Sequence, residues 1–597
     1  WKDELAERID LEPLSERDVG ELADAVLGGS TTGPAIRWLY ETSGGNPLYV
    51  RELIRGAVAS ASLSEQGGVW TLNLPWEIPG RLAELVDARV AELDASLLGI
   101  VEQLAVADSI GLALLAGIGD SHALEEAERH GLVSVRAEGR RVTASLVHPL
   151  YGEVLRHRTG ALRGKRLAGI LAKALAGTPM RRHDDAMLVA RWQLDAGIVG
   201  DADLLSRAAL RARQMMDMEL AARIGKVAME AGANVLTGIA LGEALFATGH
   251  HQEAEEVLRA QVPRCSNDDE LARTTRARVY NLGILIGDQE RAIAAADEAL
   301  AVITEPAARL QLLGQNAVNK IMSGDPFGAL ADSEEVVVGS PDEWVRMMGT
   351  FVQSWSLAMI GRTSDAIRVG TEARQLELQG KWARETAPTR QLVGLIMGLM
   401  ANGRLERAAD EAAAGYEIAA GSGDNDSISS FCLLRGMINV EAGDLGAAAL
   451  WFRSATAIDR AANDLAMIRW DLGGTALADA MAGNHANAAA ALVELEELPG
   501  HWTKLYDADL IGRGRAWTRA AAGETSAARS LLVEVADDAA RRGCLVTEAR
   551  LLHDVVRLGD AQAVVGRLRE LTNLVDGSQV PAFAAHAAAT VSGNGAS

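Results

Sequence analysis

The sequence predicts a mainly α-helical protein, most of which is an α-solenoid of paired helices. The first observation is composition, because aromatic residues make up only 4% of the chain, alanine is very frequent and β-branched runs are scarce. The second is a regular Gly and Ala spacing after residue 230. The third is a run of helices followed by a hairpin before residue 160. Together they predict a helical bundle, a winged helix and a solenoid.

The sequence of residues 1–62 predicts a small helical bundle, preceded by an extended segment at 5–14. Ser15 fits the N-cap of a first helix, with Asp18 three residues later as in a capping box. A second helix is expected from about Pro34 to the glycine pair at 44–45. A third begins at Pro47, and its apolar residues recur every three to four positions, as on one face of a helix.

Two helices are predicted to open on a proline. Asn46 and Pro47 fit the N-cap and first position of one helix, and His148 and Pro149 fit those of another. Free N–H groups and the positive end of the helix dipole suit a phosphate or another polar ligand there. The alternative is that both prolines only start helices, and the spacing alone favours this alternative.

Residues 63–160 predict a winged helix. A short strand is expected at 67–72, helices at about 80–93, 95–108 and 121–131, and strands at 133–137 and 140–147. Arg140 and Arg141 lie on the expected wing, where basic residues can bind DNA. The candidate recognition helix, S-H-A-L-E-E-A-E-R-H-G-L, is acidic, so we expect a structural or regulatory role rather than DNA contact.

Residues 161–230 predict an irregular helical linker with early repeats, and residues 231–592 predict regular repeats. Nine glycines recur 36 to 42 residues apart, each expected to end a helix in the left-handed conformation. Five residues later stands an alanine in eight cases and Val564 in the ninth, where a small side chain lets two helices approach. The nine glycines are Gly249, Gly287, Gly324, Gly361, Gly403, Gly443, Gly483, Gly523 and Gly559.

This pattern resembles the tetratricopeptide-like family, with repeats longer than its usual length. The resemblance implies a groove that binds a small-molecule inducer or a protein partner. A scaffold whose groove binds nothing specific is the alternative.

Charge and cysteine content exclude several classes of function. The chain carries 58 Lys and Arg against 81 Asp and Glu, a net charge of −23 that repels phosphate backbones. Its three cysteines lie far apart and form no metal-binding spacing, which predicts a reducing compartment and a cytoplasmic protein. The most apolar stretch, 97–118, contains Glu102 and Asp108, so we expect no membrane span.

No enzyme site is predicted. The chain contains no G-x-x-x-x-G-K-[ST] phosphate-binding loop, no H-E-x-x-H and no G-x-S-x-G. The nearest approach to a phosphate-binding loop, at 160–166, has the wrong spacing and no Ser or Thr for magnesium. We therefore expect no catalytic residues and no metal ligands.

Four stretches together resemble the large ATP-binding regulators of the LuxR type, which are signal-transduction ATPases with numerous domains. They are S-G-G-N-P-L-Y-V-R-E-L at 43–53, G-V-W-T-L at 68–72, R-L-A-E-L-V-D-A-R-V-A-E-L at 81–93 and H-P-L-Y-G-E-V-L at 148–155. The resemblance implies that 1–62 is the helical lid of a nucleotide-binding module, 63–160 its winged helix and 231–592 a sensor domain.

The resemblance also implies cofactor-binding residues. The G-x-P motif of the class, whose proline packs near adenine, matches Gly45, Asn46 and Pro47. His148 matches the histidine that contacts the β-phosphate of ADP, although Pro149 replaces the Asp that often follows. ATP or ADP would be bound mainly by an upstream domain that this chain lacks, because the chain begins at Trp1 and we expect it to be a fragment.

The predicted function is therefore the regulatory and sensor portion of an ATP-dependent transcription regulator. DNA would be bound only through a C-terminal helix-turn-helix outside this chain, and activation would involve self-association. The alternative is a helical-repeat scaffold that binds another protein and has no role at DNA.

Overall fold

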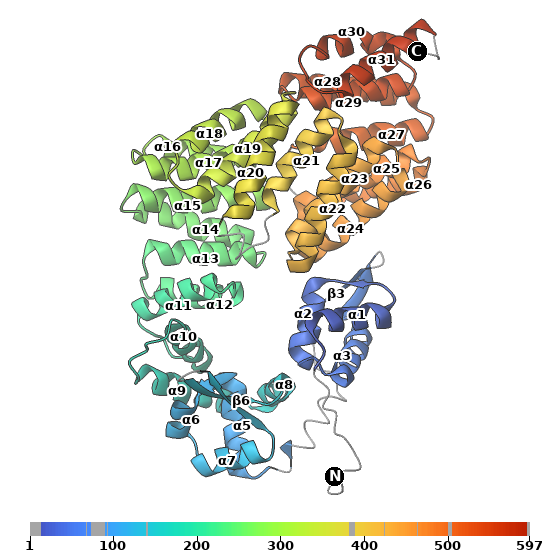
Figure 1. The fold of residues 1–597 in the computed structure, drawn as a ribbon. Helices are drawn as coiled ribbons and strands as arrows, with labels where there is room; N and C mark the ends of the chain where they lie inside the picture. The colour runs from blue at the N-terminus through green and yellow to red at the C-terminus, as the bar shows by residue number, and fades with distance from the viewer. Residues whose placement is uncertain are drawn as a thin grey trace. The chain divides into compact units, whose positions relative to one another are not determined.

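The computed structural model describes residues 13–66, 69–72, 90–91, 93–138, 141–380, 389–422, 424–462, 464–498 and 504–593. The chain divides into two compact units, residues 1–240 and residues 241–597. The described parts are mainly α-helical, as predicted, and both three-stranded sheets lie in the first unit (Figure 1). Most of the predicted extended segment at 5–14 and helix at 80–93 lie outside the described residues.

The first unit begins with the predicted three-helix bundle. Its helices are α1 (Glu16–Leu27), α2 (Gly33–Ser43) and α3 (Pro47–Ala59). The Ser15 side chain and Asp18 form the predicted capping box. Fully buried Val19, Leu39 and Leu53 bring the three helices together in one core.

A small sheet accompanies the bundle. Its strands are β1 (Ser30–Thr31), β2 (Leu63–Gln66) and β3 (Val69–Leu72), in the order β1-β3-β2. The predicted strand at 67–72 is β3, which pairs antiparallel to β2 and parallel to β1. The other two strands were not predicted, because β1 has only two residues and β2, L-S-E-Q, contains no apolar residue after Leu63.

The winged helix contains a helix and a strand that the sequence did not reveal. Its elements are α5 (Ala95–Ala107), β4 (Ser109–Gly111), α6 (Leu112–Ile118), α7 (Ser121–Arg129), β5 (Val133–Glu138) and β6 (Arg141–Leu146), with sheet order β4-β6-β5. The apolar stretch 97–118 is broken at Asp108, which has a φ of +58°. Asp tolerates this conformation better than most residues, so no Gly or Pro marks the break.

One helix and then two helical hairpins follow the winged helix. The helices are α8 (Pro149–Arg158), α9 (Ala161–Ala176), α10 (Asp185–Ala196), α11 (Ala202–Gln214) and α12 (Met218–Glu230). The pairs α9 with α10 and α11 with α12 pack closely, so residues 161–230 are regular hairpins. Trp192 is almost fully buried in the core that α9 and α10 share with the winged helix.

The described part of the second unit is a stack of helical hairpins (Figure 1). The boundary between the units lies within α13. The elements are α13 (Val235–Ala247), α14 (His251–Gln261), η1 (Val262–Arg264), α15 (Asp268–Tyr280), η2 (Asn281–Leu285), α16 (Gln289–Leu300), α17 (Pro306–Met322), α18 (Pro326–Gly339), α19 (Glu343–Met359), α20 (Thr363–Gln379), α21 (Arg390–Asn402), α22 (Leu405–Ser422), α23 (Asn425–Ala442), α24 (Leu445–Ala462), α25 (Leu465–Met481), α26 (His485–Glu497), η4 (Asp507–Gly512), α27 (Arg513–Ala521), α28 (Thr525–Arg541), α29 (Leu545–Arg557), α30 (Ala561–Leu571) and α31 (Gln579–Ser592).

The predicted glycine pattern is confirmed at all nine positions. Each glycine lies between the two helices of a hairpin and has a φ between +79° and +93°. The eight alanines five residues later are fully buried, and Val564 in the ninth hairpin is 4% exposed. The helices are therefore held at the close spacing that a small side chain permits.

Hairpins that are distant in sequence also touch within the second unit. The backbone N–H of Lys504 donates to the carbonyl oxygen of Met322 at 2.8 Å, and the Arg542 guanidinium donates to the carbonyl oxygen of Ser323 at 3.2 Å. Further along, the N–H of Ser578 donates to the carbonyl oxygen of Asn402 at 2.9 Å. The stack therefore coils back on itself, so that residues 504, 542 and 578 lie against the C-terminal ends of α17 and α21.

Candidate functional site

The turn between α2 and α3 carries three of the four predicted cofactor-binding residues. Gly44 and Gly45 both adopt the left-handed conformation, with φ of +57° and +73°. The Asn46 side chain caps α3 by accepting a hydrogen bond from the N–H of Leu48 at 3.0 Å, and Pro47 takes the first helical position. The prediction of an Asn-Pro helix opening is confirmed.

The fourth residue, His148, lies against this turn. Its Nε2 atom is 2.7 Å from the carbonyl oxygen of Ser43. Because a carbonyl only accepts, Nε2 carries the proton. The ring also meets Tyr49 edge-on, with centroids 4.7 Å apart, and a Cβ on Gly44 would come within 3.3 Å of Nε2. The structure thus brings His148 to residues that flank the G-x-P stretch, namely Ser43 and Gly44 before it and Tyr49 after it.

The environment of His148 favours the neutral imidazole. Burial lowers the pKa of His148 below its ordinary value, and the hydrogen bond to Ser43 opposes this shift in part. His148 precedes α8, as predicted, and its carbonyl oxygen accepts from the N–H of Tyr151 at 3.1 Å. Its ring, however, bonds to a residue of α2, so it connects the helical bundle to the start of α8.

The second unit contains a cavity of about 350 Å³. Its walls come from α25, from the segment 504–512, from α27, α28 and α29, and from Gly324 in the α17–α18 turn. The segment includes η4, a π-helical turn that begins at Asp507 and interrupts the approach to α27. Such turns widen the helix and commonly occur at functional sites.

The cavity is lined by more positive than negative side chains. Five are cationic: Arg469, Lys504, Arg515, Arg541 and Arg542. Three are acidic: Asp507, Glu534 and Asp538. Asp538 is already engaged at the rim, because it pairs with Arg541 at 2.9 Å and with Arg542 at 2.8 Å. A positive interior is unusual on a chain whose net charge is −23.

Three charged groups in the cavity influence one another. Burial lowers the pKa of Arg469; the charge of Asp507 opposes this, and the charge of Arg515 lowers the pKa further. Burial raises the pKa of Asp507 against the opposing effect of Arg469, Arg515, Lys504 and Arg542. In the described part of the chain, Arg515 Nε and Asp507 Oδ1 are buried without a hydrogen-bond partner.

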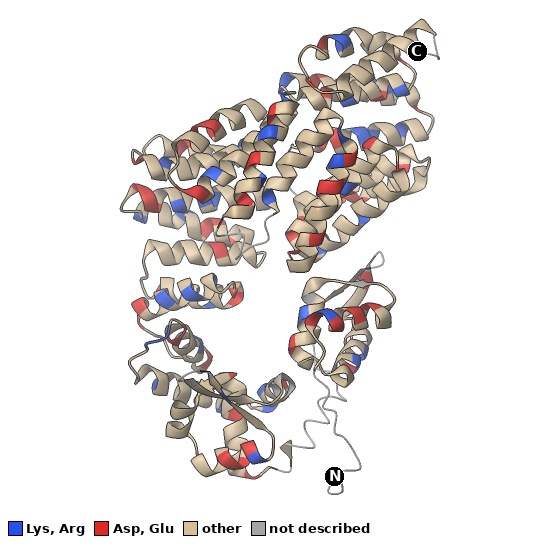
Figure 2. Ribbon diagram, in the orientation of Figure 1, with Lys and Arg blue, Asp and Glu red and all other residues tan. Residues whose placement is uncertain are grey.

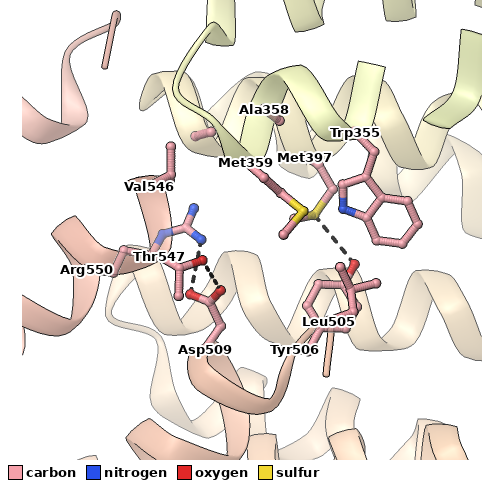
Figure 3. A pocket seen from close by; sticks show the side chains of 11 residues that line it. Trp355, Ala358, Met359, Met397, Leu505, Tyr506, Asp509, Val546, Thr547 and Arg550 are labelled. Carbon is pink, nitrogen blue, oxygen red and sulfur yellow. Dashed lines mark hydrogen bonds and ion pairs between the residues drawn. The ribbon is translucent and has the colours of Figure 1, made fainter. Parts of the chain in front are cut away.

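A smaller, water-sized cavity of about 20 Å³ lies beside the first (Figure 3). Leu505 and Thr547 line both cavities. Arg550 is only 4% exposed and points into the smaller one from α29, with Asp509 3.4 Å from its Nη1. Thr547 Oγ1 donates to the same carboxylate at 2.6 Å. A charged layer is thus buried where the stack closes on itself.

Other chemistries gain no support from the described residues. Cys432 and Cys544 are buried, and burial raises the pKa of each thiol to about 12, so neither is a ready nucleophile. Among the residues that the structure describes, no group of His, Cys, Asp or Glu is arranged to hold a metal ion. In the same residues, no helix has both the length and the apolar character needed to cross a bilayer.

The candidate recognition helix α7 is acidic on its exposed side. Glu125 and Glu128 are exposed, whereas Ala123, Leu124 and Ala127 are buried. Figure 2 shows the acidic residues of the chain in red. Such a surface disfavours contact with a phosphate backbone.

The chain matches no protein-family model and no curated protein. Similar solved structures include a signal-transduction ATPase with numerous domains and a tetratricopeptide repeat sensor from Pyrococcus horikoshii. It is 13% identical, the match covers 85% of this chain and 75% of that chain, and the TM-score is 0.38. A Rap protein complexed with competence and sporulation factor is 15% identical over 59% of this chain and 99% of that chain, with a TM-score of 0.45. Apo RapI is 13% identical over 56% and 98%, with a TM-score of 0.33.

The cationic cavity was missed by the sequence analysis. Its lining residues run from Gly324 to Thr547, and only the adjacent Arg541 and Arg542 form a visible basic pair. Residues so far apart come together only through the coiling of the stack, which no local pattern reveals.

Proposed function

We propose that this chain is the regulatory and sensor portion of an ATP-dependent transcription regulator of the LuxR type. In broader terms, we propose a helical-repeat sensor or protein-binding scaffold. In the proposal, residues 1–62 act as the lid of a nucleotide-binding core encoded outside this chain, and the winged helix relays the state of that nucleotide to the repeats.

The observation that carries the proposal is the contact of His148 with the turn at 43–49. The Nε2 atom of this histidine reaches a carbonyl oxygen 105 residues earlier in the chain, where α2 and α8 pack together. Here its ring links the lid to the helix that leaves the winged helix. Pro47 and Asn46 follow directly, at the N-terminus of α3, where N–H groups favour a phosphate or another anion.

The proposed mechanism is a two-state switch. Pro47 would pack beside the adenine of ADP and His148 would contact its β-phosphate, and these contacts would hold the lid and winged helix on the core. An inducer on the repeats favours the open state, in which ATP replaces ADP and the protein self-associates. The inducer can act only through its differential affinity for the two states.

The test uses the protein expressed from the complete gene, with fluorescent ADP as the probe. His148→Ala is expected to weaken ADP binding at least about tenfold, as the loss of a charge-assisted contact would. His122→Ala is the matched control, because His122 is exposed on α7 and its side chain has no described contact with the lid. Equal ADP affinity in the two variants would remove His148 from the switch.

The flanking gene sequence separates this function from the scaffold alternative. A phosphate-binding loop upstream and a helix-turn-helix downstream are expected for the regulator. Their absence would favour a helical-repeat scaffold that binds a protein partner.

A further inference from the structure

We propose that the cationic cavity between α25, α27 and α28 binds a small anionic molecule carrying a phosphate or carboxylate group. This inference names the ligand class of the sensor repeats. The binding of an anion does not depend on the proposed function. Only the regulatory effect of that binding rests on it.

The size of the cavity favours a small molecule. Its volume of about 350 Å³ lies at the lower end of the range for small-molecule sites, about 300–1,000 Å³. Val535, Ala539 and Ile511 supply apolar contact area, while the charged side chains supply orientation.

The charge distribution favours an anion. Arg542 is held in place by Asp538 and by the Ser323 carbonyl, so it forms part of the wall. Arg469, Lys504 and Arg515 line the cavity with the carboxylates Asp507 and Glu534, while the third carboxylate, Asp538, is paired with Arg541 and Arg542. Arg515 has a single described ion pair, at 3.7 Å with Glu496 on the surface, and its buried Nε lacks an acceptor. An anion beside Arg469 and Arg515 would supply that acceptor and offset the repulsion between them.

The position of the cavity links binding to the closure of the stack. Gly324 approaches so closely that a Cβ on it would lie 2.9 Å from Nη1 of Arg542. Lys504 is bonded through its backbone to Met322, on the same turn. A ligand that holds Lys504 and Arg515 together therefore stabilises the contact between the α17–α18 turn and the segment 504–542.

The experiment titrates the purified chain, free of nucleotide, with two probes by calorimetry. Pyrophosphate represents phosphate-bearing ligands and citrate represents carboxylate-bearing ones, with glucose as the neutral comparison. At least one anion is expected to bind saturably, and affinity should fall as salt is raised, because the site is charged and partly open. Hydrogen exchange at 320–327 should slow when the binding probe is added.

Some variants are expected to weaken anion binding and another to tighten it. A variant that simply failed to fold could only weaken binding. Arg469→Gln and Arg515→Gln should each weaken binding about tenfold or more, as expected for the loss of a charge-assisted hydrogen bond. Asp507→Asn should tighten binding, because it removes a competing carboxylate. Arg519→Gln is the matched control, on the same helix as Arg515 but exposed.

Two outcomes would overturn the proposal. One is the absence of saturable binding of both anions at millimolar concentration. The other is wild-type affinity in Arg469→Gln and Arg515→Gln. The calorimetry contains no nucleotide, so a negative result would not affect the proposed role of His148. A negative result in the ADP-binding test would likewise not affect the proposed anion site.

Discussion

Two buried carboxyl groups in the second unit interact with each other electrostatically. Asp471 on α25 is fully buried and Asp459 on α24 is 3% exposed. Ser429 Oγ donates to Asp459 at 2.5 Å, but burial still raises the pKa of Asp459 to about 7 and raises that of Asp471 well above its ordinary range. Because the two groups interact, they titrate as a pair that holds a proton near neutral pH.

This pair predicts that the second unit loses stability as the pH rises toward neutrality. The folded pKa values lie above the unfolded value of 3.8, so the native state binds more protons and the free energy of unfolding falls between about pH 4 and pH 7. Asp471→Asn should flatten this dependence in urea unfolding curves. Asp537→Asn, at an exposed position of α28, should keep it. A slope retained in Asp471→Asn would contradict the assignment.

Single residues were predictable where their role is local. Ser15, Asn46 and Pro47 cap or start the helices that directly follow them, and sequence spacing is enough to show this. Asp459 and Asp471 were not singled out, because a buried acid looks like a solvated one until the neighbouring hairpin is placed. The same holds for Arg550, whose burial depends on α19 and η4.

At the scale of elements, glycine decides where helices end. The nine repeat glycines were predictable because the left-handed conformation is a local demand of the helix end. The breaks that were missed lack this signal: α5 ends at Asp108, and the π-helical turns η2 and η4 depend on packing with neighbouring helices.

The turn between α2 and α3 gives a prediction at this scale. Gly45→Ala should destabilise the first unit by at least about 3 kcal/mol, because a Cβ there would lie 2.3 Å from the carbonyl oxygen of Leu14 and φ is +73°. Gly28→Ala is the matched control, since Gly28 has a φ of +70° but open space around it. It should cost only about 1 kcal/mol. Equal losses of unfolding free energy would show that the close approach of Leu14 is unimportant.

In the second unit as a whole, the coiling of the stack is fixed by contacts between distant hairpins. Asp576 accepts hydrogen bonds from the N–H groups of Thr363 at 2.7 Å and Ser364 at 3.1 Å. Arg362, the residue before α20, provides no side-chain cap, so a residue 213 positions away caps this helix.

Loss of this cap should loosen both helices that it joins. Asp576→Ala is expected to lower the local opening free energy of α20 and α31 by about 1–2 kcal/mol, as removal of a helix cap does. Hydrogen exchange read by mass spectrometry would show faster exchange at 363–367 and at 579–592. Asp342→Ala, which removes a cap within one hairpin, should affect only the start of α19. Unchanged exchange of α31 in Asp576→Ala would refute the coupling.

The two candidate sites differ in how far the sequence could predict them. The proximity of His148 to the turn at 43–49 was expected through the resemblance to nucleotide-controlled regulators, because the two proline openings imply a shared partner. The cationic cavity was not expected, because it depends on how far the stack coils between Gly324 and Arg542.

The contact of Asn402 with Ser578 also restricts how this protein can evolve. In an open array a hairpin can be duplicated or deleted and the neighbours simply restack. Here, the two ends of the stretch 403–577 contact each other. Adding or removing one hairpin within it would therefore separate Ser578 from Asn402 and Asp576 from Thr363. The copy number of that stretch is therefore set by geometry, and relatives that preserve the closure should vary in length only outside it.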